Sequence, residues 1–222
     1  MLGVRRTLPE PAAFIRENLR PSPAPMLPEI TLFQAHPGSG LARLGATPYW
    51  AYLWAGGAAL ARHILQTPEV ARGLCVLDLG AGSGVVGIAA AKAGARRVIC
   101  ADTNPFSTAA SALNADINGV VIEVWGEDVT RRPPPEVDLI AAGDVFYAAD
   151  VGARMARWFD RCTSAGIAVL VGDPGRKHLP RRRLQLLAEY PVRDFGEGEG
   201  RPATHGMVFA FTSPQPPEAV VP

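Results

Sequence analysis

The stretch VLDLGAGSGVVGIAAAKAG, residues 76–94, decides the fold class. An apolar run that contains Asp78 leads into glycines at positions 80, 82 and 84, and a run of Val, Ile and Ala follows that only Gly87 interrupts. This order predicts a buried strand, a tight turn and a helix. Glycines let the backbone approach a ligand closely, and the N-terminus of a helix presents N–H groups. We therefore expect a ligand-binding turn at the carboxyl end of the strand.

The rest of the chain repeats this strand and helix alternation, which predicts an α/β fold. We expect a seven-stranded, mostly parallel Rossmann-like sheet, in which the last two strands form an antiparallel hairpin around the glycine-rich loop GEGEGRPATHG. The expected strands are 74–79, 97–101, 121–125, 137–142, 167–172, 191–195 and 206–211. The expected helices are 56–65, 85–93, 105–117, 150–161 and 180–189.

The composition and the alternation of expected strands and helices divide the chain into three parts. Residues 1–48 are rich in proline but also in large apolar residues, so we expect an N-terminal extension that packs on the core, with a helix near residues 11–19 and a short strand in EITLFQAH. Residues 49–212 form the main domain. Residues 213–222 lack any period, which predicts a disordered tail.

Composition argues against several classes of partner. The 22 basic and 21 acidic residues give a net charge of +1, which gives no support to a nucleic-acid partner. No run approaches the roughly 20 apolar residues of a membrane span, so we expect no membrane partner. The 4 histidines are scattered and the 3 cysteines lie far apart, two of them in apolar runs, so we expect no metal site.

The glycine turn alone leaves two cofactor classes open. Gly82, Gly84 and Gly87 also match the G-x-G-x-x-G spacing of dinucleotide sites. Asp78, however, stands two residues before the first glycine, where it would repel a pyrophosphate and attract the ammonium group of S-adenosylmethionine. Neither lysine of the chain has the neighbours of a hydride-transfer site. We therefore favour methyl transfer over hydride transfer, with a non-catalytic binding module as a further alternative that the intact loop disfavours.

Carboxylates at the ends of the next two strands suit an adenosine. Asp102 ends the second strand of the main sheet, where its carboxylate can accept hydrogen bonds from both ribose hydroxyls. Asp128 follows the third strand and can accept from the adenine amine. The expected cofactor residues from this pattern are Asp78, Gly80, Gly82, Gly84, Asp102, Thr103, Asn104 and Asp128.

The segment GDVFY, residues 143–147, ends the strand that should lie beside the first. In a doubly wound sheet ligands bind at the carboxyl ends of the strands, so Asp144 and Tyr147 are expected to face the reactive methyl group. The competing interpretation is that Asp144 caps the following helix. Methyltransferases that act on bases place two prolines in this motif, and their absence argues against a base as the substrate. The pattern Asp-x-x-Tyr resembles that of seven-strand protein-lysine methyltransferases.

Two further segments narrow the resemblance. FIRENLRPSPAPMLPEITLFQAH, residues 14–36, and PYWAYLWAGGAALARHIL, residues 48–65, together with the glycine turn and GDVFY, resemble the family that methylates lysines on the β-subunit of electron transfer flavoprotein. The likeness spans roughly residues 13–211. It implies that Trp54 and Gly57 line the S-adenosylmethionine site. Ala55 departs from the proline that the family typically has there.

The resemblance also carries expectations about partners. It implies a protein-lysine N-methyltransferase in which Asp144 and Tyr147 form the methyl-acceptor end, acting on the flavoprotein β-subunit. We expect a monomer in the bacterial cytoplasm. A small-molecule amine methyltransferase of the same fold remains the alternative, because residues 1–48 can serve either as a lid over a small substrate or as part of a docking surface.

Overall fold

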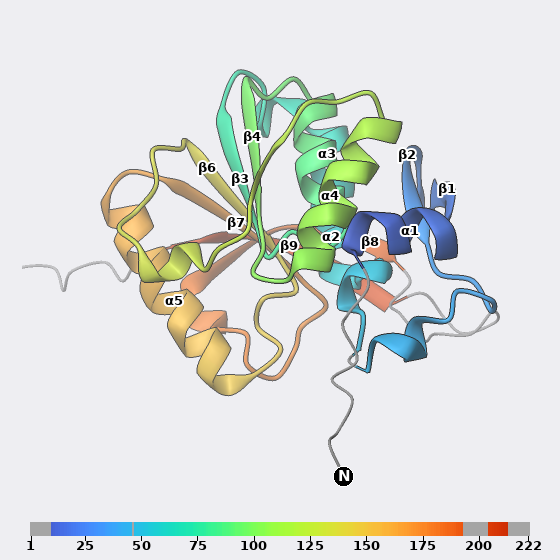
Figure 1. Cartoon of the computed structure of the whole chain (residues 1–222). Coiled ribbons are helices and arrows are strands. Elements are labelled where there is room, and N and C mark those ends of the chain that lie inside the picture. Colours follow the sequence, from blue (N-terminus) through green and yellow to red (C-terminus); the bar gives the residue numbers. More distant parts are fainter. Residues whose placement is uncertain (1–9, 46, 193–203, 213–222) are drawn as a thin grey trace, which may run out of the picture.

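The computed structural model describes residues 10–45, 47–192 and 204–212, which fold around a twisted seven-stranded sheet (Figure 1). The strand order is β5-β4-β3-β6-β7-β9-β8, in which neighbours from β5 to β7 are parallel and β9 runs antiparallel to both β7 and β8. The predicted α/β sheet with a C-terminal antiparallel hairpin is confirmed. The strands are β3 Cys75–Leu79, β4 Arg97–Ala101, β5 Glu123–Trp125, β6 Leu139–Gly143, β7 Ala168–Asp173, β8 Leu184–Val192 and β9 Thr204–Phe211.

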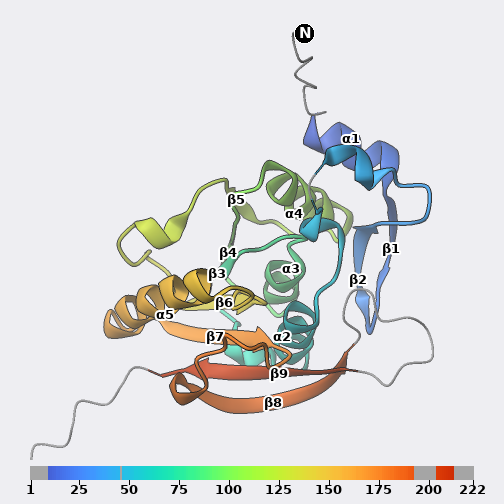
Figure 2. The same ribbon diagram turned by 90° about the horizontal axis from the view of Figure 1, so that it is seen from below.

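Helices cover the two faces of the sheet unequally (Figure 2). Helices α2 (Ala55–Gln66), α3 (Val85–Lys92) and α4 (Pro105–Ile117) lie on one face, and α5 (Ala149–Ser164) lies on the other. Strand β3 is buried along its whole length because both of its faces are covered. Val76 joins the apolar cluster beneath α2 and α3, whereas Leu77 joins the cluster beneath α5. Short 3-10 turns η1 Leu41–Leu44, η2 Tyr49–Ala51, η3 Pro68–Val70, η4 Val129–Arg131 and η5 Arg181–Arg183 connect these elements.

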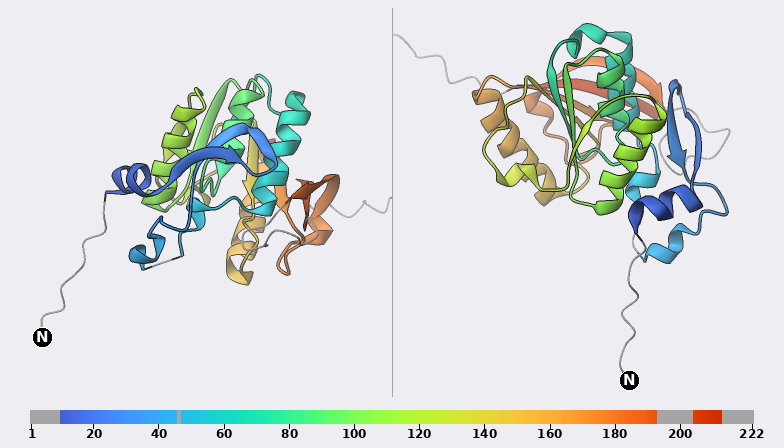
Figure 3. Two further views of the ribbon diagram at one scale, coloured as in Figure 1. Left: turned by 90° about the vertical axis from the view of Figure 1, so that its right-hand side faces the viewer. Right: turned by 45° about the horizontal axis from the view of Figure 1, so that its top comes forward.

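The N-terminal segment lies against the outer side of α3 and α4 (Figure 3). It consists of α1 (Pro11–Asn18) and an antiparallel hairpin of β1 (Arg20–Ala24) and β2 (Leu27–Gln34). Glu10 starts α1, because its carboxylate accepts hydrogen bonds from the backbone N–H groups of Ala12 and Ala13. The predicted helix and the strand in EITLFQAH are confirmed. Strand β1 was not predicted, since two of its five residues are prolines, which cannot donate to a ladder.

One asparagine joins this segment to the glycine turn. Asn114 of α4 is fully buried. Its side-chain oxygen accepts a hydrogen bond of 2.8 Å from the backbone N–H of Phe33, and its Nδ2 donates over 2.8 Å to the carbonyl of Ser83. The hairpin and the turn are therefore held by the same side chain.

The expected helix at 180–189 is wrong. After the 3-10 turn Arg181–Arg183, the chain forms the edge strand β8, which pairs with β9 over its length. LQLLAE has a composition that suits a helix, but backbone pairing with β9 overrides that local preference. The strand expected at 191–195 thus begins earlier, at Leu184. Positions 193–203, which include most of the expected glycine-rich loop, and the expected tail at 213–222 lie outside the described residues.

The first turn of α2 packs backbone to backbone on the ends of β6 and β7. A Cβ atom added to Gly172 would lie 2.1 Å from the carbonyl oxygen of Gly56, and one added to Gly143 would lie 2.7 Å from the Cα of Gly57. Only glycine fits such an approach. This contact sets the position of α2 over the sheet.

The described residues contain neither a membrane-spanning helix nor a cluster of metal-binding side chains. Among them, no helix combines the length and apolarity that a bilayer crossing requires. Nor does this part of the chain gather three or more His, Cys, Asp or Glu side chains into a group that could hold a metal ion.

The contact at α2 predicts an asymmetry between two glycine substitutions. Gly172→Ala should lower the free energy of unfolding by about 1 to 3 kcal/mol, because the new methyl group overpacks the backbone of Gly56. The matched control is Gly126→Ala, where the nearest atom would be 3.9 Å from the added Cβ. Urea unfolding monitored by circular dichroism measures both. Equal effects of the two substitutions would contradict this account of the packing.

Candidate active site

The glycine turn lies where the strand order reverses, between β3 and β6. Gly80, Gly82 and Gly84 all have positive φ angles, of 69°, 54° and 78°. The N–H groups of Gly80 and Ala81 donate to the carbonyl of Ala101 at the end of β4. Gly84 then caps the start of α3. This is the strand, turn and helix that the sequence predicts, at the position where doubly wound sheets bind ligands.

Segments on two sides close around the turn. Ser111 of α4 donates a hydrogen bond of 3.2 Å to the carbonyl of Gly82, and a Cβ at Gly84 would come within 3.0 Å of the same serine. On the other side, a Cβ at Gly82 would lie 3.9 Å from the Cα of Trp50. The segment before α2 therefore runs past the turn, and Trp50 itself is anchored by stacking on Phe106 with 5.4 Å between ring centroids.

Asp102 stands at the rim of the turn. One carboxylate oxygen accepts from the N–H of Gly82 at 3.0 Å, and the other accepts from the N–H of Asn104 at 2.9 Å. Asn104 caps α4 by accepting from Phe106, and Thr103 between them is exposed. Each carboxylate oxygen retains acceptor capacity beyond these bonds. The carboxylate is thus fixed in a position that suits a vicinal diol.

Asp78 lies elsewhere than expected. We placed its carboxylate at the mouth of the turn, but the side chain is only 1% exposed and accepts a hydrogen bond of 2.8 Å from the N–H of Gly87, in the first turn of α3. The alternation of side chains along β3 directs Asp78 to the same face as Val76, under the helix. Burial raises the pKa of this carboxyl to about 7, the Gly87 N–H lowers it, and the nearby charge of Asp102 raises it. Direct contact with an ammonium group stays a prediction.

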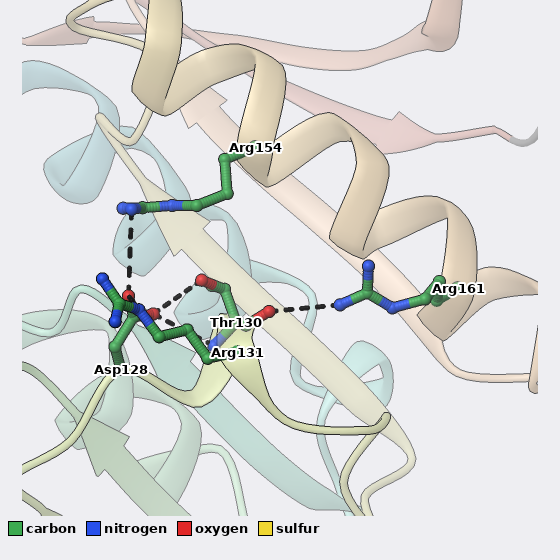
Figure 4. A network of polar contacts seen from close by, with 5 residues as sticks. All are labelled: Asp128, Thr130, Arg131, Arg154 and Arg161. Atoms are coloured by element: carbon green, nitrogen blue, oxygen red, sulfur yellow. Dashed lines mark hydrogen bonds and ion pairs between the residues drawn. The ribbon is translucent and has the colours of Figure 1, made fainter.

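Asp128 is bonded to residues of its own loop and to helix α5 (Figure 4). Its carboxylate accepts from the N–H and the hydroxyl of Thr130, and it pairs with Arg131 at 3.1 Å and with Arg154 of α5 at 3.8 Å. Burial raises the pKa of this carboxyl, but the Thr130 hydrogen bonds and the charge of Arg154 outweigh burial and hold the pKa below its ordinary value. Arg161 also reaches from α5 to the carbonyl of Thr130. The network orders the loop beside the site, and the adenine contact stays a prediction.

Asp144 caps a helix, but not the one that follows it. Its backbone is in the left-handed region, with φ of 58°, which turns the side chain toward the first turn of α2. One carboxylate oxygen accepts from the N–H of Gly57 at 2.7 Å, and the other accepts from Arg176 at 2.7 Å. The following helix α5 has Ala148 as its N-cap, without a side-chain cap. Burial raises the pKa of the Asp144 carboxyl, and the Arg176 hydrogen bond and charge oppose that rise.

Trp54 lies near this carboxylate, because both contact Arg176. Trp54, at the start of α2, donates from its indole nitrogen to the carbonyl of Tyr49, and the two rings lie 5.6 Å apart. The guanidinium of Arg176 lies 5.9 Å from the centroid of the Trp54 ring. Tyr147 is 66% exposed. The structure thus brings Trp54, Gly57 and Asp144 together, while the sequence analysis missed Arg176.

Comparison with known proteins decides the family. A model of ribosomal protein L11 methyltransferase (PrmA) matches residues 60–143. An electron transfer flavoprotein beta subunit lysine methyltransferase from Xenopus laevis is 35% identical over 213 residues, covering 90% of this chain and 87% of the relative. The human protein of the same description is 33% identical, covering 91% of this chain and 82% of its own length. The chain belongs to this family of lysine methyltransferases.

Solved structures agree on the fold of this lysine methyltransferase. A 16S rRNA methyltransferase of Thermus thermophilus aligns with a TM-score of 0.57 at 20% identity, covering 87% of this chain and 50% of that chain. A Pyrococcus horikoshii protein that is described as an RNA methyltransferase aligns with a TM-score of 0.54 at 16% identity, covering 72% of this chain and 83% of that chain. At such identities the likeness concerns the fold alone, which is the Rossmann-like sheet of methyltransferases.

The residues of the site fit S-adenosylmethionine, the methyl donor that the family implies. The three glycines at positive φ angles let the backbone of the turn approach a ligand closely, and Asp102 presents acceptors for two ribose hydroxyls. Ala55 replaces the typical proline without disturbing the helix, because α2 still begins at that residue. When bound, the cofactor supplies a methyl group on a cationic sulfur.

Asp102→Ala should weaken binding of S-adenosylhomocysteine by about 10- to 150-fold, the equivalent of roughly 1.5 to 3 kcal/mol for lost hydrogen bonds to a charged acceptor. The substitution also frees the N–H of Gly82. Asp102→Asn, which can still accept from Gly82, should retain more affinity than the alanine variant. Titration calorimetry measures all three proteins, and unchanged affinity in Asp102→Ala would remove this residue from the site.

The raised pKa of Asp78 predicts a pH-dependent stability. In the unfolded chain the carboxyl titrates near 3.9, so its contribution favours folding below that pH and is lost as the pH rises to about 7. The loss is on the order of 4 kcal/mol. Asp78→Asn removes this titration. The difference in free energy of unfolding, variant minus wild type, should therefore increase from pH 5 to pH 8. Urea unfolding without cofactor measures both proteins. If their free energies of unfolding changed in parallel with pH, this account of Asp78 would be contradicted.

Proposed function

We propose that the protein transfers methyl groups from S-adenosylmethionine to lysine side chains of the β-subunit of electron transfer flavoprotein. The observation that carries the proposal is the 33–36% identity to relatives described as lysine methyltransferases of that subunit, over two thirds or more of their length. Support comes from the acidic and aromatic groups at the ends of β6 and α2, beside the glycine turn. A Cβ at Gly80 would lie 3.5 Å from Val145, so the turn and the GDVFY segment are neighbours.

Methylation of lysine requires the neutral amine. The ammonium form has no lone pair, and removing its proton near pH 7 costs about 4 kcal/mol, given an unperturbed pKa of about 10.4. We assign Asp144 to orient the acceptor nitrogen, with the proton leaving to water. Alignment for an in-line attack is the main contribution that such a site can make.

Tyr147 is assigned to the mouth of the acceptor site. Its exposed ring follows Asp144 by three residues and can lie against the stem of a lysine that enters from a protein partner. Attraction between an aromatic ring and a cationic or methylated nitrogen contributes roughly 0.5 to 2 kcal/mol. Asp128 and Asp102 act on the cofactor side through the loops that they order, and Asp78 acts there through its hydrogen bond to the first turn of α3.

The direct test combines the purified protein, labelled S-adenosylmethionine and the purified flavoprotein β-subunit. We expect label on lysines of the subunit, identified by mass spectrometry. Asp144→Asn should reduce the rate at least about 100-fold, equivalent to some 2.7 kcal/mol, because an amide accepts from Gly57 but supplies no negative charge.

The controls separate the possible failures. Affinity for S-adenosylhomocysteine should change little in Asp144→Asn, which would show that the site is still folded. A subunit in which the labelled lysines are replaced by arginine should take up no label. Label that enters only small molecules of a cell extract, and never the subunit, would favour a small-molecule amine methyltransferase and defeat the proposal.

A further inference from the structure

Arg176 is built into the acceptor end from three directions. It follows β7, and its backbone N–H donates over 2.6 Å to the carboxylate of Asp173. Its Nη2 donates over 2.7 Å to Asp144, and its guanidinium lies beside the ring of Trp54. The side chain is 25% exposed and that of Asp144 is 12% exposed. A cation held in this way is a fixed part of the site.

The pair determines the charge next to the acceptor position. The first turn of α2 supplies only Ala55 and two glycines, so it contributes no titratable group. Asp173 of β7 is fully buried, its Oδ1 accepts from the N–H groups of Gly175 and Arg176, and the positive charge of Arg181 lies nearby as a counter-charge. Beyond these, the surrounding segments bring Tyr147 after β6 and Tyr49 before α2, and both are exposed. Among the described residues, Asp144 and Arg176 thus form the ion pair in hydrogen-bond contact at this position, and the two charges of the pair sum to zero.

An unpaired carboxylate would hinder methyl transfer, if the function proposed above holds. A negative charge within a few ångströms favours the ammonium form of lysine and raises its pKa. The reaction needs the opposite, because the lone pair of the neutral amine forms the new N–C bond. The electrons of the broken C–S bond stay on sulfur, and the proton of the former ammonium goes to water.

We infer that Arg176 is a positioning residue that compensates the charge of Asp144, so that the carboxylate orients the acceptor lysine without retaining its proton. Asp144 keeps its hydrogen bond to Gly57 on one oxygen and its partner Arg176 on the other. A lysine amine that meets this carboxylate also meets the guanidinium, whose positive charge opposes the ammonium form. A cation beside a lysine lowers the pKa of that lysine and so activates its amine as a nucleophile.

The test compares pH–rate profiles of Arg176→Gln and Arg176→Lys, with the flavoprotein β-subunit at saturating concentration, from pH 6.5 to pH 10. Arg176→Gln should be about tenfold or more slower at pH 7.5, since a rise of one unit in the apparent pKa leaves a tenth of the neutral amine, and this deficit should shrink as the pH rises toward that pKa. Arg176→Lys, which keeps the charge, should follow the wild-type shape. A loss in Arg176→Gln that is the same at every pH would show a merely structural role and overturn the inference.

The double variant Arg176→Gln with Asp144→Asn separates an effect of charge from an effect of misfolding. It leaves no unpaired buried charge, so it should unfold at a temperature close to that of wild type. Its rate is lower because alignment is lost, but the apparent pKa of its profile should return toward the wild-type value. If the double variant kept the raised pKa, the carboxylate would not be the group that retains the proton.

A second readout needs no activity. Carbon-detected NMR follows the titration of the Asp144 carboxyl in the cofactor-free protein, where loss of the guanidinium in Arg176→Gln should raise the pKa of Asp144 by about one unit or more. An unchanged value would overturn the charge compensation. If the wild-type protein failed to methylate the subunit while this shift was observed, the proposed function would fail and the pairing would stand.

Discussion

The site depends on how closely α2 approaches the ends of β6 and β7. Because Gly56, Gly143 and Gly172 carry no side chains, the first turn of α2 rests directly on strand backbone. Its N–H groups then point at the carboxyl edge of the sheet, where Asp144 accepts one of them. A helix N-terminus stabilises a carboxylate, which offsets part of the cost of burying Asp144. The strained left-handed backbone of Asp144 persists because these contacts determine it.

The cofactor side of the site follows from the same edge. Asp102 at the end of β4 and the glycine turn after β3 are fixed to each other by the N–H of Gly82. The turn is in turn bonded to α4 through Ser111 and Asn114. The groups that bind a ligand at this edge are therefore fixed by hydrogen bonds between side chains and the backbone of the turn, which is the preorganisation that a group-transfer reaction needs.

Sequence patterns predicted most of the fold and part of the site. The turn between β3 and α3 and the strands up to β7 were readable because each is a short apolar run bounded by Gly, Asp or Asn. The edge strand β8 was not, since its sequence suits a helix and only pairing with β9 decides otherwise. Asp78 was misplaced for a similar reason. Its place in the motif, two residues before Gly80, suggested a side chain at the mouth of the turn. The side chain instead lies on the face of β3 that α3 covers.

Arg176 could not have been found from motif spacing. It is 32 residues from Asp144 in sequence, and the two meet only because β6 and β7 are neighbours in the sheet. A signal was nonetheless present in the segment GDPGR, residues 172–176, where an acid, a turn and an arginine follow the strand beside GDVFY. Polar residues after adjacent parallel strands meet at one edge, so the pair becomes predictable once the strand order is known.

The double attachment of Asn114 has a thermodynamic consequence. The N-terminal hairpin and the glycine turn hold opposite ends of one buried amide, so a force that shifts the hairpin also reaches the backbone carbonyl of Ser83. Linkage is reciprocal: if a macromolecule bound to the hairpin changes the affinity of the turn for its ligand, the ligand changes the affinity for the macromolecule by the same factor. Under that condition, binding of the macromolecule at the hairpin and binding of the ligand at the turn would be coupled through α4 without direct contact between the two.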